Sequence, residues 1–355
     1  MAQANGADSR PGLTMVARSA PDFTTAATLP PIPGLRFRHF AGPDDYPAMN
    51  DAANDARAAN GAHAITTVDA FVNYYAHFDP AHCDLQRDLF IVEIDGRLVG
   101  YGRTDWDDEE AARAHYVICF LRPEARRRGI GRAMLATLEE RATVALGEHP
   151  TSVPAFFSAD TIGDSGADEL LRQAGYVPAR YHYVMVRPNL DPVPDAPMPD
   201  GLEIRPVRDE HLRQIFDAGT EAARGLWEWT EPTEADFDLF VTDPMESDRT
   251  LWRIAWDGDE IAGQVRAFIN HENNERFGTK RGWVEHILVR APWRRRGLAR
   301  ALIASSVDAL RERGMTEGAL GVDVDNPSGA LRLYESVGFE VDSTETAYRK
   351  PMPRR

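Results

Sequence analysis

Two short arginine runs in this chain could bind an anion. In each run, three arginines are followed by a glycine, an apolar residue, a small residue and a further arginine. The first run is Arg126, Arg127, Arg128, Gly129, Ile130, Gly131 and Arg132, and the second is Arg294, Arg295, Arg296, Gly297, Leu298, Ala299 and Arg300. Guanidinium groups form charge-assisted hydrogen bonds with phosphate oxygens, and a glycine lets the backbone approach a ligand closely. We therefore expect a phosphate-bearing ligand at one or both runs.

The segments around each run predict how it is positioned. An apolar strand precedes each run, ending at Leu121 in the first copy and in Ile287, Leu288 and Val289 in the second. Apolar residues at helical spacing follow each run, as at Leu302, Ile303, Val307 and Leu310. A strand that enters a helix through a short loop brings the unpaired amides and the positive dipole end of that helix to the loop. This arrangement predicts a pyrophosphate cradle. Neither copy has the glycine spacing of a Rossmann or Walker loop, and the simpler interpretation is a solvated basic face.

The arginine runs belong to a longer internal repeat. Gly34-Leu35 recurs as Gly201-Leu202, an Asp-Gly turn recurs at Asp95 and Asp257, and the ends of the copies share Gly175-Tyr176 and Gly338-Phe339. The order is the same in both copies and the separation is nearly constant, which indicates a duplicated domain. We expect a flexible tail over 1–33, a first domain over 34–187, a proline-rich linker over 188–200 and a second domain over 201–355. Each domain is expected to be α/β, with helices packed on a mixed sheet.

Composition narrows the possible functions. The chain has 355 residues and a net charge of −16, which disfavours nucleic acid as a partner because phosphates would be repelled. No stretch is long and apolar enough to suggest a membrane partner. The two cysteines, Cys83 and Cys119, have no metal-ligand spacing, so no metal is expected. Cys119 lies in an apolar run and is predicted to be a buried free thiol, which fits a cytoplasmic location.

The arginine-glycine pattern after an apolar strand resembles the acyl-CoA signature of the GNAT acetyltransferase superfamily. The matching residues are Arg126, Gly129 and Gly131 in the first half, and Arg294, Gly297 and Ala299 in the second. The resemblance implies two tandem domains, each with a mostly antiparallel sheet that contains a splayed strand pair. It also implies that acetyl-CoA is the co-substrate, with its pyrophosphate on the loop amides and its pantetheine along residues 287–289. The first-half loop is a possible second cofactor site.

The resemblance also suggests roles for two residues of the second half. Residues 326–339 are similar to the family's second motif, in which a tyrosine protonates the CoA sulfur, and Tyr334 matches that tyrosine. Asn326 is expected to cap this helix, with Pro327 at its first position. A glutamate on the pantetheine strand often acts as the base, and Glu285 matches one of the two usual positions, while Trp283 occupies the other. His286 is expected on the opposite strand face. The simpler interpretations are that Tyr334 is a core residue and that Glu285 merely attracts a cationic amine.

The first half departs from this pattern. Counting back from Gly175 places Leu171 where Tyr334 stands in the second half, and Gly163 where Asn326 stands. The first-half strand that corresponds to 283–287 has no carboxylate. We therefore expect the first half to be a degenerate copy and the second half to be catalytic.

The expected acceptor is a small-molecule amine, bound by Trp227, Glu228 and Trp229 through cation–π contacts and charge attraction. A packed aromatic helix is the simpler interpretation of these residues. The ending Thr346-Ala347-Tyr348 resembles the mycothiol synthase branch of the tandem members, which acetylates a cysteinyl amine with its C-terminal half. Protein or peptide acetylation and non-catalytic acyl-CoA sensing are competing functions. The chain is expected to be a pseudo-dimeric monomer or a homodimer.

Overall fold

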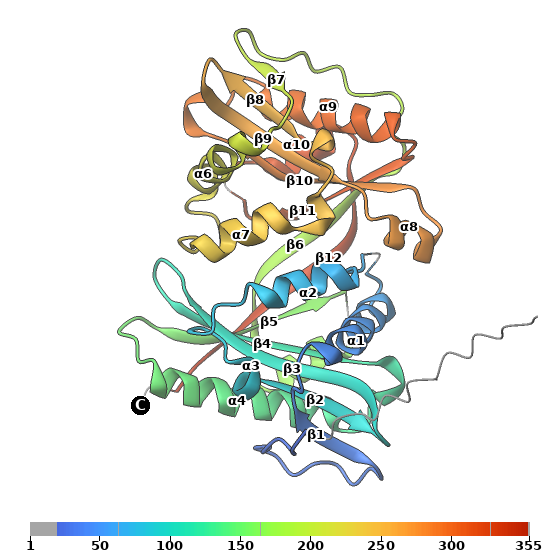
Figure 1. Ribbon diagram of the computed structural model, residues 1–355, viewed down its shortest axis with the longest axis vertical. Coiled ribbons are helices and arrows are strands. Elements are labelled where there is room, and N and C mark those ends of the chain that lie inside the picture. Colours follow the sequence, from blue (N-terminus) through green and yellow to red (C-terminus); the bar gives the residue numbers. More distant parts are fainter. Residues whose placement is uncertain (1–19, 63, 164, 327, 354–355) are drawn as a thin grey trace, which may run out of the picture.

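The computed structural model describes residues 20–62, 64–163, 165–326 and 328–353. In these residues the two halves form similar units that lie end to end (Figure 1). The strands of the first half are β1 (Leu35–His39), β2 (Leu89–Ile94), β3 (Arg97–Asp108), β4 (Arg113–Leu121), β5 (Ala155–Ile162) and β6 (Val177–Arg187). The strands of the second half are β7 (Glu203–Arg205), β8 (Arg253–Asp257), β9 (Glu260–Phe268), β10 (Arg281–Val289), β11 (Glu317–Asp323) and β12 (Glu340–Pro351).

The helices follow a similar order in both halves, except that α3 precedes β2 in the first half and α8 lies between β9 and β10 in the second. The first half contains α1 (Tyr46–Ala59), α2 (Val68–Ala76), α3 (Leu85–Asp88), α4 (Ile130–Glu148) and α5 (Gly166–Gln173). The second half contains α6 (Leu212–Ala223), α7 (Glu234–Thr242), α8 (His271–Phe277), α9 (Leu298–Glu312) and α10 (Ala330–Ser336). Short 3-10 turns lie between them, including η4 (Pro244–Glu246). The mixed α/β class expected from the repeat is confirmed. None of the helices in the described ranges has the length and apolar character needed to cross a membrane.

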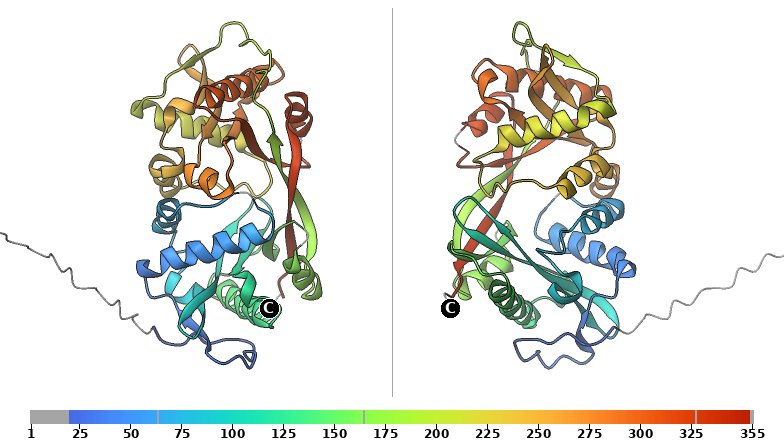
Figure 2. Two further views of the ribbon diagram at one scale, coloured as in Figure 1. Left: turned by 90° about the vertical axis from the view of Figure 1, so that its right-hand side faces the viewer. Right: turned by 60° about the vertical axis from the view of Figure 1, so that its left-hand side comes forward.

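The last strand of each half lies in the sheet of the other half. The described strands form one 12-stranded sheet in the order β1-β2-β3-β4-β5-β12-β6-β11-β10-β9-β8-β7. β12 pairs antiparallel with β5 on one side and with β6 on the other, and β6 pairs antiparallel with β11. Figure 2 shows β6 and β12 as long neighbouring strands that run from one half to the other. Strand pairing therefore crosses the boundary expected at the linker, and the division into two domains at 188–200 stays a prediction.

The exchanged strands also exchange core residues. Tyr348 of β12 is fully buried with Met134 and Leu138 of α4, in the core of the first half. Met185 of β6 is fully buried with Leu302 and Val307 of α9, in the core of the second half. Because burial of apolar surface is the main favourable contribution to folding, each core depends on a strand from the other half.

Local turn residues explain the β2–β3 and β8–β9 hairpins. Asp95 and Gly96 connect β2 to β3, and both have positive φ, as a tight two-residue hairpin requires. In the second half, Asp257 instead pairs with Glu260, so the two turn residues are Gly258 and Asp259. The Asp-Gly pair thus marks both hairpins, but its place in the second is shifted by one residue.

Buried polar contacts tie β12 to the first half. The carboxylate of Asp168 on α5 accepts hydrogen bonds from the Tyr348 hydroxyl at 2.9 Å and from Thr161 Oγ1 at 2.7 Å. Asp168 is 3% exposed, so each donor replaces water that the carboxylate lost on folding. These hydrogen bonds hold β12 in the first half in addition to the apolar contacts of Tyr348.

We expect Tyr348→Phe to lower the free energy of unfolding by about 1 to 2 kcal/mol, because a buried carboxylate loses one hydrogen-bond donor. Urea denaturation of the full chain measures this loss. Tyr181→Phe is the matched control, since Tyr181 lies on the neighbouring strand β6 and its side chain is exposed. Equal stability of the two variants would show that the Asp168 contact does not stabilise the exchange.

Candidate functional site

The second arginine run forms the expected strand-loop-helix junction. α9 begins at Leu298, with Gly297 before it at φ 88°, a left-handed conformation that suits glycine. The first bond of the helix runs from Ala301 N to Gly297 O at 3.1 Å, so the amides of Leu298, Ala299 and Arg300 precede the helical ladder. A Cβ built on Gly297 would have no atom within 4 Å. The backbone here is open and presents donors, which fits a pyrophosphate group.

The first arginine of each run binds protein carbonyls. The Arg294 guanidinium donates to Val289 O at 2.9 Å and to Ala222 O at 3.2 Å. Arg126 repeats this geometry, donating to Leu121 O at 3.1 Å and to Ala56 O at 3.0 Å. These side chains fix the end of a strand against the end of a helix, and the phosphate contact expected of them stays a prediction. Two further guanidinium groups also donate to carbonyls: Arg296 to Asp200 O and Arg300 to Ser336 O. The loop amides are therefore better candidates for phosphate donors than these side chains.

β10 and β11 pair in parallel only from Arg281 to Trp283 and then separate. A cavity of about 210 Å³ lies where they diverge, and we call it the Tyr334 cavity. Its walls include Leu226, Trp227, Glu285, His286, Ile287, Gly321, Asn326 and Tyr334. The splayed pair expected for this sheet is thus present beside the loop, and it brings Glu285 and Tyr334 to one cavity.

Glu285 is a carboxyl group in a poorly solvated place. Its Oε1 accepts a hydrogen bond from Gly321 N at 3.0 Å. Burial raises the pKa of Glu285 to about 8, against the effect of that hydrogen bond, and the nearby carboxylate of Glu246 adds to the rise. A carboxyl group with such a pKa changes its protonation close to neutral pH, as a general base must.

Tyr334 lies on α10 and is 6% exposed. Burial raises its pKa well above the usual range, and the charge of Glu285 acts in the same direction. The phenol therefore keeps its proton at physiological pH and can donate it.

Asn326 lines the Tyr334 cavity, but it does not cap α10 as expected. The helix begins at Ala330, after Gly329 at φ 75°. The side chain of Asn326 accepts instead from Ser328 N at 3.0 Å and from Ser328 Oγ at 2.6 Å, closing a local turn before the helix. The expected role of Pro327 falls outside the described residues.

His286 does not point away from Glu285 as strand alternation predicts. The pairing of β10 with β9 shifts register between Glu285 and Leu288, and His286 has φ 50°. This bulge redirects the side chain, so His286 lines the Tyr334 cavity together with Glu285. Both residues also line a second cavity of about 380 Å³, which we call the Ile65 cavity because residues 64–66 of the first half close it. No sequence signal marked the bulge, since the strand contains neither glycine nor proline at that point.

The tryptophan segment expected to bind the acceptor is only partly directed at the site. Trp227 lines the Tyr334 cavity, with the Arg349 guanidinium 4.2 Å and that of Arg180 5.1 Å from its ring centre. Glu228 pairs with Arg349 at 3.4 Å. Trp229 lies 5.3 Å from the Arg224 guanidinium. The cations expected from a substrate are here supplied by the protein's own arginines, and a role in acceptor binding stays a prediction.

The first half has a similar cleft with different walls. A cleft of about 480 Å³ lies beside Arg126, Arg127, Gly129, Gly131 and Arg132. β4 pairs with β3 without interruption from Arg113 to Leu121, so this strand has no bulge. Ile118 lies opposite Arg103, as Glu285 lies opposite Arg266 in the second half. Leu171, at the place of Tyr334, is buried in the core.

The prediction for Cys119 is wrong. Its side chain is exposed on this first-half cleft, because the apolar strand borders the opening between β4 and β5. Cys83 is the buried free thiol.

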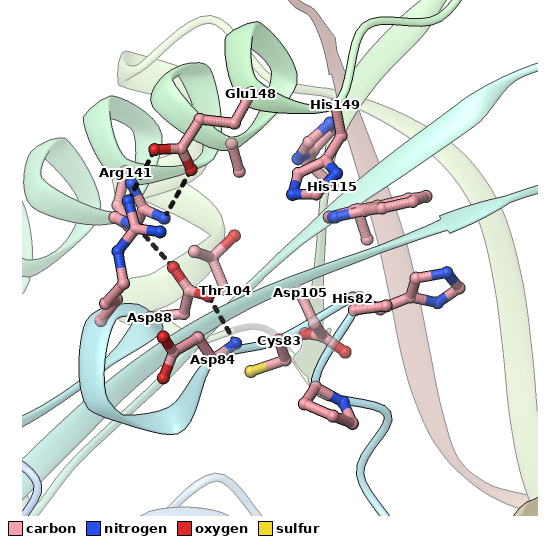
Figure 3. A pocket seen from close by; sticks show the side chains of 15 residues that line it. His82, Cys83, Asp84, Asp88, Thr104, Asp105, His115, Arg141, Glu148 and His149 are labelled. Atoms are coloured by element: carbon pink, nitrogen blue, oxygen red, sulfur yellow. Dashed lines mark hydrogen bonds and ion pairs between the residues drawn. The ribbon is translucent and has the colours of Figure 1, made fainter.

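A separate polar cavity of about 150 Å³ lies at the other end of the first-half sheet (Figure 3). His115 is fully buried there and its two ring nitrogens have no hydrogen-bond partner. Burial lowers the pKa of His115 to about 4, and the charge of Arg113 lowers it further. Among the described residues, no group of three or more His, Cys, Asp or Glu side chains has a metal-binding arrangement.

Comparison with known proteins relates this geometry to a family. The acetyltransferase (GNAT) family model matches residues 53–148 and 212–339. A mycothiol acetyltransferase of Geodermatophilus obscurus is 31% identical over 274 residues, which cover 74% of this chain and 82% of that protein. A mycothiol acetyltransferase of Salinispora arenicola is 30% identical and covers 86% of this chain and 94% of its own length.

Solved structures agree with the family match. A GCN5-related N-acetyltransferase from Sphaerobacter thermophilus has a TM-score of 0.66 and 25% identity, covering 91% of this chain and 97% of that one. A tandem GNAT protein from the clavulanic acid biosynthesis pathway has a TM-score of 0.65 and 18% identity, covering 90% and 100%, and shares the fold. The chain therefore belongs to the acetyltransferase (GNAT) family and carries the family fold in tandem.

Proposed function

We propose that the second half transfers an acetyl group from acetyl-CoA to the primary amine of a small molecule. The observation that carries this proposal is the meeting of Glu285 and Tyr334 at one cavity, beside the open loop at the start of α9. One group has a pKa near neutrality and the other holds its proton firmly. Such a difference between neighbouring groups suits a base and an acid of one reaction.

The proposed roles follow from the positions of these groups. Acetyl-CoA would supply an activated acetyl thioester, with its pyrophosphate on the amides of Leu298–Arg300 and its pantetheine along Ile287–Val289. Glu285 takes the proton of the acceptor ammonium, which frees the nitrogen lone pair for attack on the thioester carbon. Tyr334 donates its proton to the sulfur as the carbon–sulfur bond breaks. The first half lacks both groups, so it serves as a structural partner and a second candidate acyl-CoA site.

The acceptor would reach Glu285 from the Ile65 cavity. This cavity shares Glu285 and His286 with the Tyr334 cavity, and its walls come from both halves. Its volume of about 380 Å³ is in the range of small-molecule sites. The names of the relatives favour a cysteinyl amine of the mycothiol type as the acceptor. Peptide amines and a sensor without turnover are the competing functions.

A screen of acetyl-CoA with chemically distinct amines tests the function. The panel contains an S-methylated cysteinyl glucosamine, spermidine, phenethylamine and a lysine-containing peptide, and release of the CoA thiol is measured. Turnover of the first compound would support the mycothiol-type acceptor. Binding of acetyl-CoA without turnover of any amine would support the sensor.

We expect Tyr334→Phe to lower kcat by roughly 100-fold or more, because the departing sulfur loses its proton donor. Binding of acetyl-CoA, measured by calorimetry, should stay within a few-fold of the wild type. Tyr183→Phe on β6 is the control, since Tyr183 packs against the core of the same half. Unchanged turnover in Tyr334→Phe would contradict the acid role.

The rate should depend on pH through Glu285. The carboxyl group accepts a proton only when it is ionised, so kcat/KM should rise with pH and level off above about 8. Glu285→Gln should abolish this rise of kcat/KM with pH and lower the rate by roughly 100-fold. Glu275→Gln, on the exposed surface of α8, should preserve the pH dependence and the rate. If kcat/KM of Glu285→Gln still rises with pH in this range, the pH dependence belongs to another group.

Calorimetry can locate the acetyl-CoA site that supports turnover. We expect Gly297→Glu to abolish both binding at the second-half loop and activity, because a carboxylate would stand among the phosphate donors. Gly129→Glu, the matched change in the first half, should leave the activity intact. Loss of activity only in Gly129→Glu would reverse the roles of the two halves. Thermal unfolding of each variant checks that the loops still fold.

A further inference from the structure

The bulge in β10 places a histidine where the sequence predicts none. His286 has φ 50°, a left-handed conformation that is uncommon for residues other than glycine and occurs mainly for Asn, Asp and His. A non-glycine residue held in this conformation is strained, and such strain concentrates at functional sites. The result is that two consecutive residues, Glu285 and His286, line the same two cavities.

A buried carboxylate fixes the His286 ring. Nε2 of His286 lies 2.8 Å from Oε1 of Glu246, which is carried by η4 and is 6% exposed. The other oxygen of Glu246 lies 3.1 Å from the Arg266 guanidinium. Burial would raise the pKa of Glu246, but the hydrogen bond from His286 and the positive charge of Arg266 hold it below its usual value. Glu246 is therefore ionised and accepts the Nε2 proton, which leaves Nδ1 of the neutral ring as a proton acceptor.

The ring is accessible as well as fixed. The His286 side chain is 43% exposed, in contrast to Glu246 behind it. Partial desolvation by the cavity walls and the charge of Arg266 lower the pKa of His286 despite the opposing effect of the Glu246 carboxylate, so the ring is neutral near pH 7. Several other charged or titratable groups face this region: Asp243 beside η4, Arg266 on β9, Glu285 on β10, and His182, Asp323 and Tyr334 around the Tyr334 cavity.

We propose that His286, held by Glu246, carries the acceptor's proton from Glu285 to solvent through the Ile65 cavity. The inference rests on the proposed function of Glu285. The ammonium N–H bond breaks as an O–H bond forms on Glu285, and that O–H bond breaks as an N–H bond forms at His286 Nδ1. Water in the Ile65 cavity then takes this proton, and Glu285 returns to its ionised form. Glu246 is a positioning residue, since it stabilises the transient imidazolium and acts only through His286.

This relay accounts for a difficulty in the reaction. A base with a pKa of about 8 retains its proton at neutral pH, so it needs an outlet in each cycle. Within the described part of the chain, the hydrogen bond to its carboxylate comes from the amide of Gly321, which donates a proton and cannot accept one. His286 follows Glu285 directly in the chain and lines the same two cavities, so its Nδ1 can take the proton and pass it to water.

The test compares kcat against pH for His286→Asn, His286→Gly and Glu246→Gln, with the panel amine that the wild type acetylates fastest. Asparagine and glycine both tolerate a positive φ, so the bulge should persist in the histidine variants. We expect kcat near pH 7 to fall by roughly 10-fold to 100-fold in both, with the KM for acetyl-CoA unchanged. Added imidazole should restore part of the rate. Glu246→Gln should show a smaller loss, and His271→Asn on the exposed surface of α8 should show none.

The result that overturns the proposal is a wild-type kcat and pH profile in both His286 variants. Loss of activity that imidazole does not restore, together with a raised KM, would also overturn it, because that pattern indicates displaced substrate. If one histidine variant fails to fold, the other and Glu246→Gln give the same decision. Glu285→Gln separates the two claims: its full activity would refute the proposed base, whereas an inactive Glu285→Gln beside an active His286→Asn would refute only the relay.

Discussion

The position of β12 between β5 and β6 constrains the rest of the structure. An interior strand must satisfy its backbone donors and acceptors on both sides, and β12 does so with β5 on one side and with the exchanged strand β6 on the other. The two halves therefore share one continuous sheet. Contacts across the middle follow from this: residues 64–66 close a cavity beside Glu285, and Asn270 and Asn273 bind the backbone of Ile65. A site formed only by the second half would lack this wall.

Duplication gave two similar frameworks that have diverged at one strand. β4 and β10 both leave their parallel partner after a short pairing, and both precede a loop clamped by an arginine. Of these two strands β10 has the register shift, and the cavity beside it brings Glu285 and Tyr334 together. The uninterrupted β4 instead places the exposed thiol of Cys119 along its cleft. The two halves thus differ in backbone conformation, through the bulge in β10, as well as in the residues equivalent to Glu285 and Tyr334.

Much of the framework could be predicted from the sequence because it depends on local patterns. The strand-loop-helix junctions, the α9 face of Leu302 and Val307, and the splayed pair beside Glu285 follow from periodicity, glycine placement and the family resemblance. The exchange of β6 and β12 could not be predicted, because both arrangements bury the same apolar residues and differ only in which half supplies them. The bulge at His286 was also hidden, since strand alternation assumes a regular backbone. Arg294 and Asn326 show a third limit: their side chains can bind a ligand or the nearby backbone equally well, and only the folded geometry decides.

The electrostatics of the site follow from how its carboxyl groups are compensated. Glu246 has Arg266 and His286 as close partners and remains ionised despite its burial. Glu285 accepts a hydrogen bond from the amide of Gly321 and forms no ion pair with any described residue, so burial and the negative charge of Glu246 raise its pKa. Glu345 on β12 adds to this effect from the exchanged strand. Because Arg266 and His286 keep Glu246 ionised, the negative charge of Glu246 helps to raise the pKa of Glu285 toward neutral pH. The two carboxyl groups differ in pKa because only Glu246 has close cationic or hydrogen-bonding side-chain partners among the described residues. In a chain with a net charge of −16, the location of the few well-placed cations determines which carboxyl group can exchange a proton.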